Sequence, residues 1–446
     1  RMLWVKERET DVLTSLYNRR KMAETLEGFA RDVIEKPDGV VMMDIDWFKS
    51  YNDEFGHAAG DDCLKTFGQM LSQSDWNANV NNPKSYDFDL TDEMLQDMIN
   101  VGTEPFFRLG QSIEHESKKY GIYPPKDFKK WAKICEHIIR HYTEGWADGH
   151  EMDITYWEIW NEPDLDDPGE RWKTDPRTWG GTQEQFYELY EVTAKHLKKC
   201  FPHLKIGGPA FANPRKYGPP FFDYLKKTGT PIDFFSWHMY HRRPERISED
   251  VHVVRQILDE KGFTAVESIL NEWNYNKSWT EKDYYSRYVR RSIKAAAFMA
   301  GVMSECQNGP VDMLMYYDLR PNTTWNGAFM PHTYDILPAY WALYYWAELA
   351  DFGTQVKSDC AGKDIYTTAA RSADGKLRLL LIRYNEDDSV KDLKEVTVSV
   401  PQGYRLASVR LTDSQKELNR NIDPSGESLT LTLESNAVAL IEFLPL

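Results

Sequence analysis

Short apolar runs alternate with longer amphipathic stretches through the middle of the chain. The runs have the length of buried strands, and the stretches between them have the period of roughly 3.6 residues that marks a helix. Strand and helix in alternation are typical of parallel βα units, and a long series favours a (β/α)8 barrel over a doubly wound sheet. The runs are two short of a complete barrel and comprise Glu104–Gly110, Ile154–Trp160, Lys205–Pro209, Asp233–Trp237, Ser268–Glu272 and Val311–Tyr317.

The amphipathic stretches predict the helices of the same barrel. The clearest are Thr91–Val101, Phe128–Tyr142, Gln183–Cys200 and Tyr284–Ser304. We therefore expect an α/β fold built on a (β/α)8-type barrel that is incomplete or has a substituted first unit.

The carboxyl-terminal part of the chain changes to a period of two. This alternation is typical of strands with one buried face, and turn residues such as Asp374-Gly375 separate the segments. The spacing predicts an antiparallel β-sandwich. Its expected strands are Lys376–Tyr384, Glu395–Val400, Arg405–Leu411, Ser428–Leu433 and Ala437–Phe443.

The amino-terminal part predicts a small α-β-α unit. Apolar spacing indicates a helix over Lys21–Ile34, a short buried strand over Val40–Ile45 and a second helix over Asp62–Leu71. At about 65 residues, such a unit is too small to be stable comfortably by itself. We place the domains at residues 1–74 for this unit, 75–345 for the barrel and 346–446 for the sandwich.

Composition and charge exclude several classes of protein. A hydrophobic fraction of 41% is ample for a buried core, which excludes wholesale disorder. The chain has 70 acidic and 54 basic side chains, and its net charge of −16 is a poor match to a phosphate backbone, so no nucleic acid partner is expected. The 5 cysteines form no C-x-x-C pair, so neither a disulfide framework nor a zinc site is indicated.

Membrane insertion and export are not indicated. No uninterrupted apolar stretch reaches the roughly 18–20 residues that a membrane helix needs. The sequence from Arg1 to Glu7 lacks the apolar core of a signal peptide. The chain as given is therefore expected in the cytoplasm, without a membrane partner.

Two glutamates follow apolar runs of the predicted barrel. Glu162 comes after Asn161, and Glu272 comes after Asn271. Barrel enzymes carry their reactive groups at the carboxyl ends of strands, and two carboxyl groups about 5–5.5 Å apart are the geometry of a retaining glycosidase. Taken singly, either glutamate could instead face solvent or form a structural ion pair with an arginine. The neighbouring Trp157, Trp160 and Trp273 favour the catalytic interpretation, because aromatic faces stack on sugars.

Four segments in order resemble glycoside hydrolase family 39, a retaining family of the (β/α)8-barrel clan. They are Glu104–Gly110, Trp157–Asp164, Ile206–Ala210 and Leu270–Asn274, and the resemblance runs from about residue 75 to residue 446. It implies that Glu162 is the general acid/base, that Glu272 is the nucleophile and that Asn161 binds the sugar 2-hydroxyl.

The resemblance also proposes further substrate-binding residues. His238 and Tyr240 stand where the clan places residues that orient the nucleophile, although aromatic packing at a barrel rim would explain them equally well. After the eighth strand the clan usually has a tryptophan, whereas this chain has Tyr317, which can substitute, with Trp325 as a second candidate.

The start of the barrel departs from the family pattern. The Arg-x-His type motif that the family carries on its first barrel strand, beneath the terminal-sugar subsite, is missing. Arg108, Gln111 and His115, on or after the predicted third barrel strand, are candidates to compensate for it.

The residues in place of that start resemble half of a GGDEF-type diguanylate cyclase domain, over about residues 9–72. The resemblance rests on Asp11–Arg20 and Met43–Asp61, in which Asp44 and Asn52 match positions used for metal and guanine. The Gly-Gly-Asp/Glu-Glu-Phe loop itself is absent, so cyclase activity is not expected. Our hypothesis is that a cyclase fragment became joined to a truncated family 39 gene, and that Val40–Ile45 replaces a missing barrel strand.

A histidine pair gives a weaker signal. His137 and His141 have the i, i+4 spacing of helical zinc ligands, but Ile138 occupies the place of the glutamate in H-E-x-x-H, which favours two ordinary helical histidines.

The resemblance implies a retaining exo-glycosidase for short plant cell-wall oligosaccharides or aryl glycosides, of β-xylosidase, α-L-arabinofuranosidase or β-galactosidase type, without a metal or organic cofactor. The alternative is a catalytically impaired carbohydrate-binding or nucleotide-sensing chimera. An open barrel edge would expose unpaired backbone, so a homo-oligomer that covers it is a further expectation.

Overall fold

A computed structural model of the chain describes its barrel-like and sandwich regions. The described residues are 78–111, 113, 119, 121–280, 284–320, 323–414, 420–422 and 428–446. The elements predicted within residues 1–74, including the strand Val40–Ile45, lie outside this part, as do Asp44 and Asn52.

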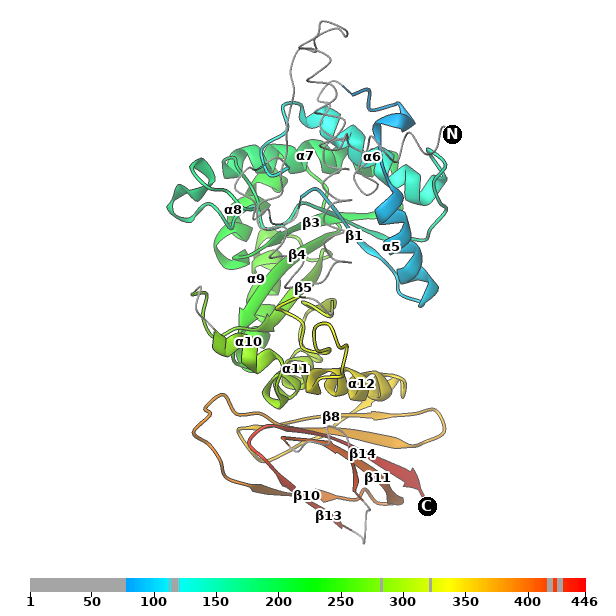
Figure 1. Ribbon diagram of the computed structural model, residues 1–446, viewed down its shortest axis with the longest axis vertical. Helices are drawn as coiled ribbons and strands as arrows, with labels where there is room; N and C mark the ends of the chain where they lie inside the picture. Colours follow the sequence, from blue (N-terminus) through cyan, green and yellow to red (C-terminus); the bar gives the residue numbers. More distant parts are fainter. Residues whose placement is uncertain are drawn as a thin grey trace, which may run out of the picture. The chain divides into compact units, whose positions relative to one another are not determined.

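Six parallel strands form one sheet in the order β1-β2-β3-β4-β5-β6 (Figure 1). Every apolar run of the middle region therefore forms a strand, and the βα architecture is confirmed as part of a barrel whose described edges are β1 and β6. The strands are β1 (Phe106–Leu109), β2 (Tyr156–Ile159), β3 (Lys205–Phe211), β4 (Phe234–His241), β5 (Glu267–Tyr275) and β6 (Met313–Tyr316).

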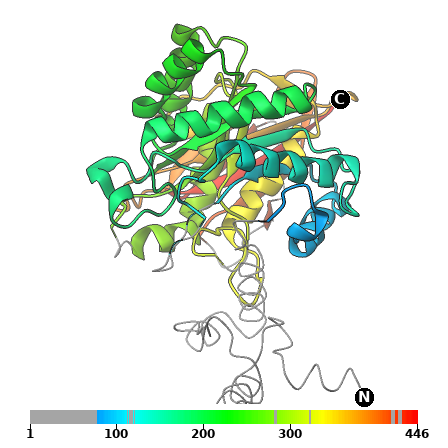
Figure 2. The ribbon, with the colours of Figure 1, turned by 90° about the horizontal axis from the view of Figure 1, so that it is seen from above.

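Helices that follow the strands cover one face of this sheet (Figures 1 and 2). α7 (Gln183–Cys200) contacts β2 and β3, α8 (Pro214–Thr228) contacts β3, and α9 (Pro244–Lys261) contacts β4 and β5. A capping box between Thr182 and Gln185 fixes the start of α7. The opposite face of the sheet holds an inner apolar cluster that includes Tyr156, Phe234 and Ile269.

One predicted helix is two helices in the structure. The stretch Tyr284–Ser304 divides into α10 (Tyr284–Arg290) and α11 (Ile293–Cys306), because Ser292 has an extended backbone with φ −111° and ψ 171°. α11 is buried almost throughout, since its alanines lie between the sheet and the carboxyl-terminal strands.

The carboxyl-terminal strands form two antiparallel sheets around a core that includes Leu381, Val409, Leu431 and Ile441. One sheet has the order β12-β11-β14-β9-β8-β7 and the other pairs β10 with β13. The strands are β7 (Thr354–Val356), β8 (Ile365–Arg371), β9 (Leu377–Arg383), β10 (Lys394–Ser399), β11 (Tyr404–Thr412), β12 (Arg420–Ile422), β13 (Ser428–Leu433) and β14 (Ala437–Pro445).

All five predicted strands of the sandwich are present, and β7, β8 and β12 add to them. β8 escaped the sequence pattern because most of its residues are buried, which removes the alternation of apolar and polar positions. Helix α12 (Pro338–Ala350) spans the boundary placed at residue 346, and its Glu348 accepts hydrogen bonds from Arg410 of β11. The domain boundaries stay predictions.

A second compact unit contains the described residues 78–104 together with residues 137–152. It includes the 3-10 turn η1 (Pro83–Ser85), helix α5 (Asp89–Asn100) and the end of α6 (Phe128–Glu144), close to the helices predicted there. Among the described helices, none combines the length and apolar character that a membrane crossing requires.

Candidate active site

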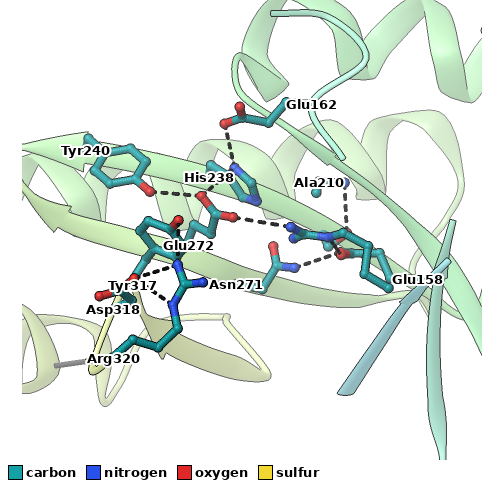
Figure 3. Close-up of polar contacts among 12 residues, drawn as sticks. Glu158, Glu162, Ala210, His238, Tyr240, Asn271, Glu272, Tyr317, Asp318 and Arg320 are labelled. Carbon is teal, nitrogen blue, oxygen red and sulfur yellow. Dashed lines mark hydrogen bonds and ion pairs between the residues drawn. The ribbon is translucent and has the colours of Figure 1, made fainter. Parts of the chain in front are cut away.

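The carboxyl ends of β2 and β5 bring the two candidate glutamates together (Figure 3). A bulge in β5 sets the position of Glu272. Trp237 of β4 pairs with Leu270, but the next residue, His238, pairs with Glu272, so Asn271 is an extra residue. A bulge lets consecutive side chains turn toward the same side of a sheet. Asn271 and Glu272 accordingly both reach the inner face.

Glu162 is held in an uncommon backbone conformation just after β2. Its φ of 45° lies in the left-handed region, which non-glycine residues adopt at a cost and mainly at functional sites. Two contacts fix it there, because its N–H donates to Ala210 O at 3.1 Å and its carbonyl accepts from Thr178 Oγ1 at 2.7 Å.

Three side chains surround the carboxylate of Glu272. The hydroxyl of Tyr240 donates to Oε2 at 2.8 Å, and Nδ1 of His238 lies 3.3 Å from the same oxygen. Nη1 of Arg108 lies 3.4 Å from Oε1. Burial and the negative charge of Glu272 raise the pKa of Tyr240 well above its usual value, so the phenol keeps the proton that it donates.

His238 connects the two carboxylates. Its Nδ1 lies 2.7 Å from Glu162 Oε1, and a carboxylate oxygen of Glu162, one of Glu272 and a ring nitrogen of His238 all lie within 4.8 Å of one another. This spacing is close to the roughly 5–5.5 Å of retaining glycosidases and is too short for the water that an inverting enzyme places between its carboxyl groups. The predicted grouping of His238 and Tyr240 around the nucleophile agrees with these contacts.

The carboxylates also perturb His238. Burial lowers the pKa of this imidazole, but the charge of Glu272 together with the hydrogen bond and charge of Glu162 outweigh burial, so the pKa is raised above its usual value. Protonated His238 thus places a positive charge between two negative ones.

This raised pKa predicts how His238 contributes to stability at different pH values. A raised folded-state pKa means that the folded protein binds more protons, so the contribution is complete below the unfolded pKa of about 6.5 and is lost as pH rises through the higher folded value. The free energy of unfolding lost in His238→Gln should therefore be largest near pH ~6 and fall by up to about 1.4 kcal/mol per pH unit within that window. Urea titrations from pH ~6 to ~9 measure it, with the exposed His203→Gln as control; a difference that grows with pH contradicts the assignment.

A buried ion pair lies beside Glu272 and joins Arg108, a candidate from the sequence, to Glu158, which the sequence did not single out. Arg108 of β1 stands directly opposite Glu158 of β2 in the parallel register, and its Nε donates to Glu158 Oε2 at 2.5 Å. Asn271 Nδ2 donates to the other oxygen of Glu158 at 2.6 Å. Glu158 is 0% exposed. Burial alone would lower the pKa of Arg108. The negative charges of Glu158 and Glu272 outweigh this effect, so the pKa of Arg108 is raised and the guanidinium stays charged.

Glu158 was detectable in principle. It is the charged residue inside the apolar run Ile154–Trp160, and a charge inside a buried strand needs a partner. What the sequence did not show is that Arg108, 50 residues earlier, supplies it.

Aromatic side chains form a wall beside Glu272, but not the tryptophans expected from the sequence. Trp157, Trp160 and Trp273 are at most 1% exposed, so they belong to the core and cannot stack on a substrate. The wall instead contains Tyr240 and Trp325 with ring centroids 5.0 Å apart, Trp279 at 5.2 Å from Tyr240, and Tyr317 at 6.1 Å from Trp325.

Both residues proposed after the last barrel strand therefore lie in this wall. Burial is the larger cause, and the negative charge of Glu272 the next, of the raised pKa of Tyr317. The Tyr317 side chain therefore lies close enough to Glu272 to be affected by its charge. Trp325 is held by the guanidinium of Arg290, 3.9 Å from the ring centroid, a cation–π contact. Trp279 is 70% exposed and was not predicted, because it lies in a loop without a motif.

The remaining candidates lie in different places. Asn161 is buried beside Glu162, and its Oδ1, itself buried, has no hydrogen-bond partner among the described residues. Gln111 lies against Gly121, and no described contact joins it to either carboxylate. His115 lies outside the described residues.

Comparison with known proteins decides the family. The model of the Glycosyl hydrolases family 39 matches residues 45–327, which is more than half of the chain. The chain belongs to glycoside hydrolase family 39. The identification from the four motifs is therefore confirmed, and with it the βα-barrel type of fold.

Relatives of this family 39 chain include a β-xylosidase of Caldicellulosiruptor saccharolyticus, 31% identical over 164 residues, which are 35% of this chain and 31% of the relative. The chain thus matches about a third of that relative's length. Its fold resembles the crystal structure of a glucosidase from Croceicoccus marinus, with a TM-score of 0.67 and 23% identity over 84% of this chain and 85% of that one.

The amino-terminal segment has a different relationship. The model of the diguanylate cyclase GGDEF domain matches residues 8–79, and the Bacillus subtilis protein YhcK is 42% identical over 67 residues, 14% of this chain and 19% of that protein. The two family matches overlap between residues 45 and 79. The resemblance of this segment to a GGDEF domain is thereby confirmed.

Proposed function

We propose that this family 39 protein is a retaining glycoside hydrolase in which Glu272 is the nucleophile and Glu162 is the general acid/base. The observation that carries the proposal is the approach of the two carboxylates to within 4.8 Å at the ends of β2 and β5, with His238 between them. Two separate structural ion pairs would give each glutamate a cation of its own at the surface. Glu162 and Glu272 instead both lie next to the same buried imidazole, that of His238.

The proposed reaction is a double displacement. Glu272 attacks the anomeric carbon and forms a covalent glycosyl-enzyme, while Glu162 gives its proton to the departing glycosidic oxygen. Glu162 then takes a proton from a water molecule, and the resulting attack on the anomeric carbon releases the sugar and frees Glu272. Tyr240 and Arg108 hold the nucleophile in place for the first step.

The proposed substrates are short plant cell-wall oligosaccharides or aryl glycosides, cleaved from one end. Similarity to a β-xylosidase favours xylosides, and arabinofuranosides and galactosides are the next candidates. The aromatic wall of Tyr240, Trp279, Tyr317 and Trp325 supplies apolar faces for a sugar ring, and Asn161, which lies beside Glu162, is the proposed partner of its 2-hydroxyl.

A panel of nitrophenyl glycosides tests the proposal with the full chain. We expect release of nitrophenol from at least one of the β-xyloside, α-L-arabinofuranoside and β-galactoside. Proton NMR of the first sugar formed should show the same anomeric configuration as the substrate, because two inversions restore it. An inverted first product would overturn the assignment of Glu272 as nucleophile.

A second candidate is a carbohydrate-binding or nucleotide-sensing chimera without turnover. The observation in its favour is that the described sheet has six strands and that Phe106 and Met313 on its edge strands are only partly buried. The same panel separates the two functions. If no glycoside is cleaved while a guanine nucleotide or an oligosaccharide binds in calorimetry, the second function is correct.

A further inference from the structure

Three potential metal ligands converge in the compact unit formed by α5 and the end of α6. A carboxylate oxygen of Asp92 and one ring nitrogen each of His141 and His150 lie within 4.8 Å of one another. We propose that Asp92, His141 and His150 form a zinc site, separate in its residues from the glutamate pair. One carboxylate and two imidazoles are donors that zinc prefers.

The distances in this cluster fit a metal ion. Asp92 Oδ1 lies 3.1 Å from His141 Nε2, and Asp92 Oδ2 lies 3.3 Å from His150 Nε2. Zinc binds nitrogen and oxygen ligands at about 2.0–2.2 Å, so two ligand atoms of a tetrahedral ion lie about 3.3–3.5 Å apart. The two Asp92–histidine separations are therefore close to those of ligands around one zinc ion.

The hydrogen bond of His141 identifies which of its nitrogens is free. Nδ1 lies 2.8 Å from Trp146 O, and a carbonyl oxygen only accepts, so Nδ1 carries a proton. In the neutral ring, the lone pair on Nε2 then faces an oxygen of Asp92, and two acceptors repel each other. A cation between them removes this conflict. Histidines that bind metals commonly donate their other ring N–H to a carbonyl in this way.

His150 offers a second ring nitrogen without a competing partner. Its Nε2 is buried and has no hydrogen-bond partner among the described residues, although Asp92 Oδ2 lies 3.3 Å away. A buried polar atom without a partner is uncommon in proteins. A metal ion would give His150 Nε2 the partner that it lacks.

The loop between His141 and His150 is built tightly around the first imidazole. A Cβ added at Gly149 would lie 2.2 Å from His141 O and 2.6 Å from His141 Nδ1, so only glycine fits. The N–H of His150 donates back to His141 O at 2.6 Å. Ala147 and Asp148 adopt left-handed φ values of 61° and 58°, a strained backbone that is retained where it has a purpose. This loop brings His150 to the end of α6.

Accessibility leaves room for one more ligand. The side chain of His141 is 2% exposed, whereas those of His150 and Asp92 are 31% and 27% exposed. An ion bound by the three side chains can therefore take a water molecule as its fourth ligand. Bound to Asp92 of α5 and to both histidines, zinc would cross-link α5 to the end of α6.

Another cluster lacks these properties. Glu136, His196 and Cys200 also converge, but Nζ of Lys133 lies 2.7 Å from Glu136 Oε2, and a lysine ammonium there opposes a metal ion. His137, which shares helical spacing with His141, is not a member of the proposed site. The sequence favoured two ordinary helical histidines over a His137–His141 metal pair, and the proposed site likewise joins His141 to Asp92, 49 residues away, and not to His137.

Calorimetry with zinc chloride tests the site. All proteins are the full chain, stripped with a chelator, in a Cys200→Ser background that removes the thiol of the second cluster. We expect the reference protein to bind one more equivalent of zinc than Asp92→Asn and His150→Gln, or to bind the same zinc more than ~100-fold more tightly. A loss of this size identifies a direct ligand, because losing a residue that only hydrogen-bonds a ligand usually costs ~10- to 100-fold in metal affinity. His203→Gln, at an exposed histidine, should bind like the reference.

Cobalt provides a second readout that does not depend on activity. The reference and His203→Gln should develop the visible absorption of four-coordinate Co²⁺, and the two site variants should lose it. Circular dichroism confirms that Asp92→Asn, a change of nearly equal size, remains folded. Equal zinc stoichiometry and affinity in all four proteins, or equal losses in the control, would overturn the proposal.

Discussion

Replacing Glu272 with glutamine is expected to lower the turnover number on aryl glycosides by on the order of 10⁴-fold or more, because an amide cannot form the glycosyl-enzyme. The reason for expecting a chemical effect rather than a folding defect is geometric. Glutamine has the same shape, and its amide oxygen can still accept from Tyr240, which now donates at 2.8 Å. Initial rates of nitrophenol release and thermal unfolding of the same samples separate the two effects.

Glu162→Gln has a different expected signature. Loss of a general acid costs about 10²- to 10⁴-fold, with the smaller loss for substrates whose leaving group departs without a proton. The rate on a dinitrophenyl glycoside divided by the rate on the nitrophenyl glycoside should therefore be higher in Glu162→Gln than in the wild type. In Glu272→Gln this ratio should not rise, because both substrates need the nucleophile. Added azide should restore turnover in Glu162→Ala with retention and in Glu272→Ala with inversion.

A matched control lies on the same strand as the nucleophile. Glu267 is the first residue of β5, five positions before Glu272, and its carboxylate accepts a hydrogen bond from the Tyr156 hydroxyl at 3.1 Å. Glu267→Gln should keep the wild-type turnover number. If this control lost as much activity as Glu272→Gln, or if Glu272→Gln kept more than about a tenth of the activity, the assignment of the nucleophile would be wrong.

Replacing Arg108 with methionine is expected to destabilise the fold by about 3–5 kcal/mol, which is the usual cost of leaving one member of a buried ion pair without its partner. Glu158 would then lie fully buried without its guanidinium partner, while Asn271 would still donate a hydrogen bond to it. Arg108 itself is 24% exposed at its side chain, so its own removal from water is incomplete. Urea-induced unfolding measures the change.

The double variant Arg108→Met, Glu158→Gln isolates the cause. If the unpaired charge dominates, neutralising Glu158 in the Arg108→Met background should recover part of the lost stability, whereas Glu158→Gln alone should be destabilising. Activity should not recover in the double variant, because Arg108 also lies 3.4 Å from Glu272 and helps to hold it. Strictly additive losses in the cycle would show that Arg108 and Glu158 do not act as a pair.

The sequence predicted the repeated elements of this chain well, for a physical reason. The central strands of this parallel sheet are largely buried on both faces, so runs such as Asp233–Trp237 are continuous. β13 matches its predicted bounds because one of its faces is exposed and the alternation is clear. Glu162 and Glu272 were proposed because strand ends carry the chemistry in barrels, and the structure brings the two carboxylates together, while their catalytic roles stay predictions.

What the sequence could not supply depends on contacts between distant residues. The pairing of Arg108 with Glu158 and of His141 with Asp92 joins residues about 50 apart, and no local pattern encodes it. The role of each tryptophan was also hidden, because Trp273 and Trp279 differ in burial although both flank the same strand end. Trp273 faces the core from within β5, where the bulge at Asn271 changes the alternation of sides, whereas Trp279 lies in the loop after the strand.

The extra residue at Asn271 has a consequence for anyone who redesigns this site. Because the strand period is two, the direction of Glu272 depends on the number of residues between Leu270 and Trp273 as well as on their identity. Libraries that vary side chains around the nucleophile preserve this count. Libraries that vary segment length, or grafts from homologues with a regular strand here, change it and rotate the nucleophile away from Glu162.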